Sequence, residues 1–358
     1  MPRFHLPSGP VGTALFLTLS LMALVTLVAV GEARADERTI VVVAQNGGTE
    51  VTDFLVPYGV LSRAGVGEVR AVSTEAGPVY LWPGLTIEAD ESVDAFDARK
   101  PDGADLVIIP AVLDPEDQVL IGWLQQQSAK GAMLVSICDG ALVLARTGLL
   151  DGRRATGHWY TRKTRQEDFP NVLWQENTRY VRDGNIATSA GVSASLPISL
   201  HLVDMLAGKA RAEALAAELS LEGFSAEHNS EAFQLGAANV WVAARNFLFG
   251  WPRDKYALVL SDGMDEIALA FAVDMFARTY RSQAVPVGSE AVRSLTGLTV
   301  LPEQPELAGA AASVGFERGG DLQLAPGAEA PEQILAFLTE QYGRDSAAFV
   351  ALQLEYPY

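Results

Sequence analysis

The stretch that decides the fold is Leu134-Val-Ser-Ile-Cys138-Asp-Gly-Ala-Leu-Val-Leu-Ala145. Its apolar first half predicts a buried strand, and its second half predicts a helix. Such a strand-to-helix junction presents the residue at the turn, here Cys138, as a nucleophile elbow does. Backbone N–H groups at the start of a helix favour negative charge, so they could lower the pKa of the thiol or hold an oxyanion. The alternative is an inert buried cysteine, which is the commoner state of a free thiol.

Strand and helix patterns alternate on both sides of this junction. Each predicted strand is apolar throughout, which is typical of a parallel sheet covered on both faces. Pro57 lies inside one predicted helix and is expected to kink or shift it. The predicted strands are residues 39–44, 105–110 and 133–137, with a late hairpin at 180–182 and 186–189. The predicted helices are residues 50–64, 114–130, 140–147 and 192–207.

The composition of the 358-residue chain excludes several classes of function. Lys and Arg total 26 against 44 Asp and Glu, a formal net charge of -18, which argues against binding to nucleic acid or to anionic lipid. Hydrophobic residues make up 49%, enough for a sizeable core. The single cysteine rules out an intrachain disulfide, and the histidines lack metal-ligand spacing, so we expect no metal. The histidines are His5, His158, His201 and His228.

The N-terminal residues 1–35 are predicted to lie outside the fold. Residues 11–30 are apolar, and Ala33 and Ala35 match the small-residue pattern of a signal-peptidase site. We expect cleavage after Ala35 and a periplasmic or secreted protein. The alternative is an uncleaved membrane anchor, since a run of about 20 apolar residues can span a bilayer. Both alternatives place the folded part outside the cytoplasm, and only the second holds it at a membrane.

A second α/β region is predicted to repeat the start of the first. When the chain is shifted so that Val43 meets Val259, one register aligns strand, turn and helix starts, which indicates an internal duplication. The alternative is two unrelated α/β segments of similar periodicity. Other matched positions are Gly47 with Gly263, Glu50 with Glu266, Asp105 with Asp321, and Pro115 with Pro331.

This repeat suggests a division of the mature chain into three parts. In the same register Asp53 meets Leu269 and Cys138 meets Leu354, so the copy lacks the elbow. We expect the copy to be a packing partner of the first domain and not a second site. The predicted parts are a first domain at 36–210, a helical linker at 211–255 and a truncated copy at 256–358.

The elbow and the residues after it resemble the DJ-1/PfpI family of the class I glutamine amidotransferase-like superfamily. The resemblance rests on Ser136 to Ala145, followed by Thr147-Gly-Leu-Leu-Asp-Gly-Arg-Arg-Ala-Thr-Gly-His158-Trp159. It is strongest to the branch of isonitrile hydratase and of the sensor-like domains in some AraC-type regulators. Three further segments agree, and the similarity covers about residues 39–208: they are Asp53-Phe-Leu-Val-Pro57, residues 105–110, and residues 188–203. The family implies a flavodoxin-like three-layer sandwich, usually dimeric, with a cysteine nucleophile hydrogen-bonded to a carboxyl group.

The resemblance also implies roles for individual residues. Cys138 would be the nucleophile, and Asp53 would lie on its sulfur as a protonated carboxyl group that moves a proton. His158 would orient or deprotonate the cysteine. The alternatives are an exposed Asp53, as most aspartates are, and a His158 held by a backbone carbonyl.

Four more residues are expected around the thiol. The backbone N–H groups of Asp139 and Ala111 would hold an oxyanion, and Tyr58 and Trp159 would line the pocket. Asp139 departs from the family pattern, in which small or hydroxylated residues are frequent at this position. Its negative charge opposes a thiolate unless the side chain points away.

Two further departures concern the backbone. Residues 110–112, Pro-Ala-Val, stand in place of the glycine pair that often supplies an oxyanion N–H in this family. Pro197 stands where a helix usually continues.

Two classes of function remain open. The first is an enzyme, a cysteine-dependent hydratase, hydrolase or lyase acting on a small electrophile such as an isonitrile, an aldehyde or an amide-like carbonyl, with no cofactor. The second is a non-catalytic module that senses or binds a small molecule, or mediates assembly as a homodimer or an intrachain pseudo-dimer. No helix-turn-helix pattern follows the first domain, so a DNA-binding regulator is not supported.

Overall fold

The computed structural model describes residues 38–316 and 320–358. The predicted signal or anchor segment at residues 1–35 lies outside these ranges. Within them, no helix combines the length and the apolar character needed to cross a bilayer.

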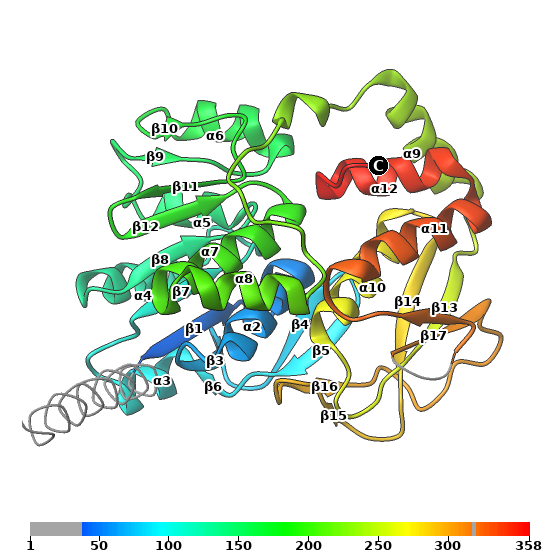
Figure 1. Cartoon of the computed structure of the whole chain (residues 1–358), viewed down its shortest axis with the longest axis horizontal. Coiled ribbons are helices and arrows are strands. Elements are labelled where there is room, and N and C mark those ends of the chain that lie inside the picture. The colour runs from blue at the N-terminus through cyan, green and yellow to red at the C-terminus, as the bar shows by residue number, and fades with distance from the viewer. Residues whose placement is uncertain (1–37, 317–319) are drawn as a thin grey trace, which may run out of the picture.

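A seven-stranded sheet forms the centre of the first region (Figure 1). The order is β11-β12-β8-β7-β1-β3-β6, and every pair is parallel except β11 with β12. Side chains of β1 alternate between two cores, with Ile40 and Val42 in one and Val41 and Val43 in the other. The strands are β1 (Thr39–Ala44), β3 (Glu68–Ser73), β6 (Glu91–Ser92), β7 (Leu106–Ile109), β8 (Met133–Ser136), β11 (Tyr180–Asp183) and β12 (Ile186–Ser189).

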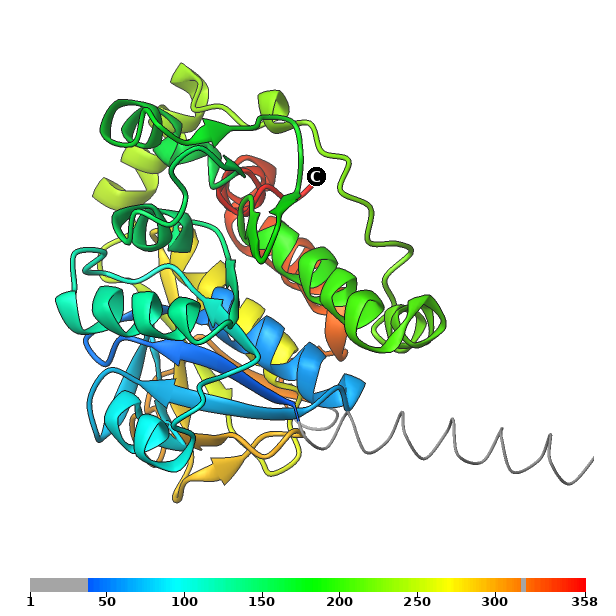
Figure 2. The same ribbon diagram turned by 90° about the vertical axis from the view of Figure 1, so that its left-hand side faces the viewer.

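Helices cover both faces of this sheet and complete the predicted three-layer sandwich (Figure 2). On one face lie α2 (Val51–Ala64), α7 (Ser195–Ala207) and α8 (Lys209–Glu218), and on the other α3 (Val93–Arg99), α4 (Gln118–Ala129) and α5 (Gly140–Arg146). Pro57 does not interrupt α2, because burial of nearly the whole helix outweighs one lost backbone hydrogen bond. Pro197 lies in the first turn of α7, where proline is tolerated.

A second parallel sheet follows α9 (Ala237–Phe249), in the order β14-β13-β17-β18. A third sheet, β15-β16-β5-β4-β2, joins the two regions because β5 pairs antiparallel with β16. The parallel strands are β13 (Asp254–Val259), β14 (Ser282–Val287), β17 (Ala312–Phe316) and β18 (Leu322–Leu324). The joining strands are β2 (Thr49–Glu50), β4 (Pro78–Trp82), β5 (Leu85–Glu88), β15 (Val292–Arg293) and β16 (Thr299–Leu301). The helices of this region are α10 (Glu266–Arg278), α11 (Ala330–Tyr342) and α12 (Arg344–Leu354).

The strand order corrects part of the predicted repeat register. The neighbours β3-β1-β7-β8 correspond to β14-β13-β17-β18, so β17 takes the place of β7 and β18 that of β8. The match of Asp105 with Asp321 therefore does not join equivalent strands, since Asp321 precedes β18. By this order the counterpart of Cys138 lies two residues after the end of β18, at Pro326, and is not Leu354. A match at one position, Asp105 with Asp321, cannot fix the register once loop lengths differ. The duplication itself stays a prediction.

Helices α2 and α10 pack against each other and exchange ion pairs. Arg63 of α2 contacts Glu266 at the start of α10 at 3.0 Å. Arg278 at the end of α10 contacts Glu50, the N-cap of α2, at 3.3 Å. Reciprocal contacts of this kind are typical of a two-fold interface between subunits, yet one chain supplies both halves here.

Candidate active site

Cys138 lies in the turn between β8 and α5, as the sequence predicts. Its φ of 54° is in the left-handed region, and its residue is 6% exposed. Gly140 is required at the start of α5, because a Cβ there would lie 2.1 Å from the carbonyl oxygen of Ile109. The strained backbone and the close approach of helix to strand are those of a nucleophile elbow.

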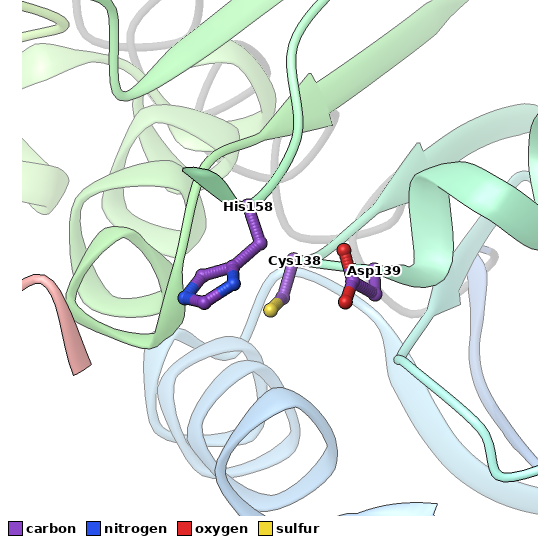
Figure 3. A group of neighbouring side chains, drawn as sticks. All are labelled: Cys138, Asp139 and His158. Atoms are coloured by element: carbon purple, nitrogen blue, oxygen red, sulfur yellow. The ribbon is translucent and has the colours of Figure 1, made fainter. Parts of the chain in front are cut away.

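The thiol has two polar neighbours, His158 and Asp139 (Figure 3). The Cys138 sulfur, a His158 ring nitrogen and an Asp139 carboxylate oxygen all lie within 4.8 Å of one another. Asp139 thus points toward the thiol, and its Oδ1 accepts a hydrogen bond of 2.6 Å from Thr161. By donor type these three residues could ligate a metal ion, and no other such cluster occurs among the residues that the structure describes.

His158 is held from the far side by the end of α12. It lies in the loop between β9 (Arg154–Ala155) and the 3-10 helix at Trp159–Thr161. Its Nε2 is 3.2 Å from the carbonyl oxygen of Gln353 and 4.0 Å from Oε1 of Glu355. These contacts use Nε2 and leave Nδ1 free to face the thiol. His158 can therefore be held by a backbone carbonyl and still act on Cys138.

Glu355 is a buried carboxylate that the sequence analysis missed. It is 1% exposed, and it accepts hydrogen bonds from the Trp159 N–H at 3.2 Å and from His228 Nε2 at 2.7 Å. Burial works to raise its pKa, but the His228 hydrogen bond and the nearby His158 lower it below the usual value. Glu355 therefore stays charged and fixes the loop that carries His158.

Asp53 lies near enough to the thiol to affect its pKa, but within the described residues it does not make the predicted hydrogen bond to sulfur. It is fully buried, and burial followed by the charge of Glu50 raises its pKa well above the usual value, as expected of a protonated carboxyl group. Its Oδ2 accepts from the Ala111 N–H at 3.1 Å, and Oδ1 has no partner within the described ranges. No hydrogen bond between Asp53 and Cys138 is found in that part of the chain. Asp53 therefore acts on Cys138 through its charge, which raises the pKa of the thiol, and not through a hydrogen bond.

The two predicted oxyanion donors differ in availability. The Ala111 N–H is already bound to Asp53, so its predicted role is wrong for this arrangement. The backbone N–H of Asp139 has no acceptor among residues 38–316 and 320–358, and it faces the same turn as the thiol. Asp139 is therefore the donor that could hold a developing negative charge.

The pKa of Cys138 is raised well above its usual value, which corrects the expected lowering. Burial is the main cause, followed by the carboxyl groups of Asp53, Asp139, Glu50 and Glu355. The start of a seven-residue helix, α5, does not offset this concentration of acidic groups. The resting state is therefore a neutral thiol, and attack on a substrate needs a base such as His158.

Removing the Asp139 charge is expected to make the thiol more reactive. An Asp139→Asn protein keeps an acceptor for Thr161 but loses a carboxylate that raises the thiol pKa. Alkylation of Cys138 by iodoacetamide near pH 7 should accelerate about three- to tenfold, since each pKa unit changes the thiolate fraction tenfold. Asp151→Asn, at an exposed position, is the control and should leave the rate unchanged. Equal rates in the two variants would contradict this electrostatic account.

Glu50, Asp274 and Arg278 form a buried charge cluster next to the site, and Glu50 and Arg278 also line its cavity. The Nε of Arg278 donates to both carboxylate oxygens of Asp274 at 2.7 Å, and its Nη2 reaches Glu50 at 3.3 Å. Burial and the charge of Asp274 raise the pKa of Glu50 to about 7. Glu50 is therefore only partly ionised at neutral pH.

The raised pKa of Glu50 predicts that stability falls as pH rises. The carboxylate form of Glu50 is destabilising only in the folded state. Below about pH 4.5 the free energy of unfolding is therefore not reduced by this group, and the reduction develops as pH rises through about 7. The loss should reach about 3 kcal/mol by about pH 8, and Glu50→Gln should reduce it. Urea unfolding at several pH values measures this, with the exposed Glu218→Gln as the control. A wild-type curve that rises with pH over this range would refute the prediction.

A cavity of about 480 Å³ opens in front of the thiol. Cys138, Asp139, His158 and Trp159 line it, as predicted for Trp159. Tyr58 does not line it: the ring is buried in α2 and stacks on Phe54 at 6.2 Å. The helical spacing of α2 turns position 58 into the core, so the predicted pocket role of Tyr58 is wrong.

A model of the DJ-1/PfpI family matches residues 38–205. Isonitrile hydratase from Pseudomonas putida is 30% identical over 161 residues, which are 44% of this chain and 67% of that protein. The HTH-type transcriptional regulator CdhR of Pseudomonas aeruginosa is 34% identical over 137 residues, which are 37% of this chain and 39% of the regulator. The chain belongs to the DJ-1/PfpI family.

Among solved structures, oxidized Toxoplasma gondii DJ-1 is similar at 26% identity and a TM-score of 0.46, covering 52% of this chain and 99% of its own. The family match confirms the resemblance predicted from the residues around Cys138, and the two relatives confirm the predicted branch. The match ends at residue 205, so Arg278, Gln353 and Glu355 lie outside it.

Proposed function

We propose that the protein is a cysteine-dependent hydratase, hydrolase or lyase that acts on a small electrophile such as an isonitrile, an aldehyde or an amide-like carbonyl. The observation that carries the proposal is the thiol at the elbow, with a His158 nitrogen within 4.8 Å and a cavity in front of it. Similarity to isonitrile hydratase supports this reaction class.

For an isonitrile the residues would act in a fixed order. The Cys138 sulfur attacks the terminal carbon while His158 takes the thiol proton and returns it to that carbon, which forms a thioimidate. Water then adds to the same carbon, the sulfur leaves with a proton, and a formamide is released. The Asp139 N–H stabilises negative charge as it develops. One isonitrile and one water give one formamide, and no oxidant or reductant is consumed.

A second function, a non-catalytic sensor or binding module, is favoured by the raised pKa of the thiol. Such a module would use the cavity without covalent chemistry. Similarity to the regulator CdhR is in line with this alternative, although only 39% of that protein is matched.

Product analysis separates the two functions. The purified protein is incubated with alkyl isonitriles and small aldehydes, and products are followed by proton NMR. Product in large molar excess over protein supports the enzyme. Saturable binding of the same compounds without product, measured by calorimetry, supports the binding module and rejects the enzyme.

We also propose that the protein works outside the cytoplasm, as a periplasmic or secreted protein. The support is the apolar run at residues 11–30 followed by Ala33 and Ala35. Cell fractionation with N-terminal sequencing tests this: a soluble form beginning at Asp36 is expected. An intact N-terminus in the membrane fraction would favour the anchor instead, and a cytoplasmic form would reject both.

A further inference from the structure

We infer that the region after the family domain has become the specificity wall of the thiol cavity and that this wall selects a neutral substrate with an apolar, ring-sized body. The inference rests on the proposed function of the thiol and adds the class of substrate.

The wall comes from three elements outside residues 38–205. Val240 and Ala243 project from α9, Tyr280 follows α10, and Phe349 and Gln353 belong to α12; all of them line the cavity. Figure 1 shows α9 and α12 side by side, and side-chain hydrogen bonds from Asn246 to Ser346 join the two helices. The predicted linker, through α9, and the predicted truncated copy, through α10 and α12, thus close the cavity of the first domain.

The wall is apolar where it faces the substrate. Phe349 is 3% exposed and meets the Tyr280 ring edge-on at 5.5 Å between centroids. Trp82 and Trp159 face the cavity from the first region. A volume of about 480 Å³ lies within the range of pockets that enclose small organic ligands, so an apolar ring can be buried there.

The charges around the cavity disfavour an anion. Glu50 and Asp139 line it, and its one guanidinium, Arg278, is already paired with Asp274 and Glu50. A carboxylate or phosphate would lose its hydration and gain no unpaired cation among the described lining residues.

A cation is disfavoured as well. Arg278 lies over the Trp82 ring at 5.7 Å, so the face of that ring is already occupied by a cation. A positively charged substrate would also approach Arg278 itself. A neutral body meets neither the acidic lining that repels an anion nor the Arg278 charge that repels a cation.

The single cysteine allows a direct test by alkylation of the full chain. Three reagents that share iodide as the leaving group are compared: iodoacetamide, N-benzyl iodoacetamide and iodoacetate. The rate of Cys138 alkylation by each reagent is divided by the rate at which the same reagent alkylates glutathione. We expect the benzyl reagent to react about tenfold faster than iodoacetamide, and iodoacetate about tenfold slower. Benzamide should protect the thiol, and benzoate should not.

Two variants locate the selectivity in the wall. Val240→Arg places a cation at the cavity, and it should raise the iodoacetate rate relative to iodoacetamide about tenfold. Leu248→Arg is the matched control, because this residue lies on the same helix, is 68% exposed and does not line the cavity. Circular dichroism of both variants checks that the fold is kept.

The inference is overturned if iodoacetate reacts as fast as iodoacetamide, if the benzyl group gives no gain, or if Val240→Arg and Leu248→Arg behave alike. A failure of the proposed enzyme gives a different result. In that case isonitriles and aldehydes give no product, while the ratios between the alkylation rates of the three reagents still report on the wall.

Discussion

A Cys138→Ala protein is expected to lose turnover by at least about a thousandfold while its affinity for an unreactive apolar amide changes by less than about twofold. The nucleophile carries the covalent step, and removal of a nucleophile leaves only the contributions of binding and oxyanion stabilisation. The cavity wall is built from other residues, so its shape survives the loss of one sulfur atom. Initial rates from product NMR and calorimetric titration measure the two quantities separately.

The control for this experiment is Asp151→Asn, an exposed substitution that should leave both the rate and the affinity unchanged. If Cys138→Ala turned over substrate at the wild-type rate, covalent catalysis would be excluded. A loss of affinity equal to the loss of rate would mean that the substitution had collapsed the cavity, and Cys138→Ser would then show the same collapse.

The second large effect is expected from Arg278→Met, which should reduce the free energy of unfolding by about 3–5 kcal/mol near pH 8. The substitution keeps an unbranched apolar stem but leaves Glu50 and Asp274 buried without their cation. Burial opposes the charge on Arg278, yet Asp274 and Glu50 outweigh it and raise its pKa. Urea unfolding followed by fluorescence gives the change. At about pH 5 the loss should be smaller, since Glu50 is then protonated.

Arg99→Met is the matched control for this substitution. Arg99 contacts Glu91 at 2.7 Å but is 39% exposed, so its removal should cost less than about 1 kcal/mol. Similar losses for the two variants would show that the Arg278 cluster contributes no more than a surface ion pair.

Much of the first region could be predicted from local sequence. The β-branched run at residues 39–44 is buried on both sides and forms β1, and the elbow around Cys138 has the predicted strand, turn and helix. These predictions succeeded because an apolar strand must be buried and a glycine at the helix start lets the helix approach that strand closely. The predicted hairpin also forms, as β11 and β12.

The chemistry of the site could not be predicted in the same way. The place of Cys138 at a helix start predicts a lowered pKa, but burial raises it, together with Asp139 and three carboxyl groups from distant segments. Asp53 was expected on the sulfur, but the Ala111 N–H takes one of its oxygens. Long-range burial and charge decide both outcomes, and neither is visible in the residues next to the motif.

The sequence by itself determined the α/β alternation, the family and the position of the one cysteine, because periodicity, turn residues and a motif of contiguous residues encode them locally. Only the tertiary structure decided which groups surround that cysteine. Glu355 and Arg278 reach the site from segments more than a hundred residues away. Such contacts depend on how α2, α10 and α12 pack in three dimensions, and packing is a property of the whole core and not of any one stretch of chain.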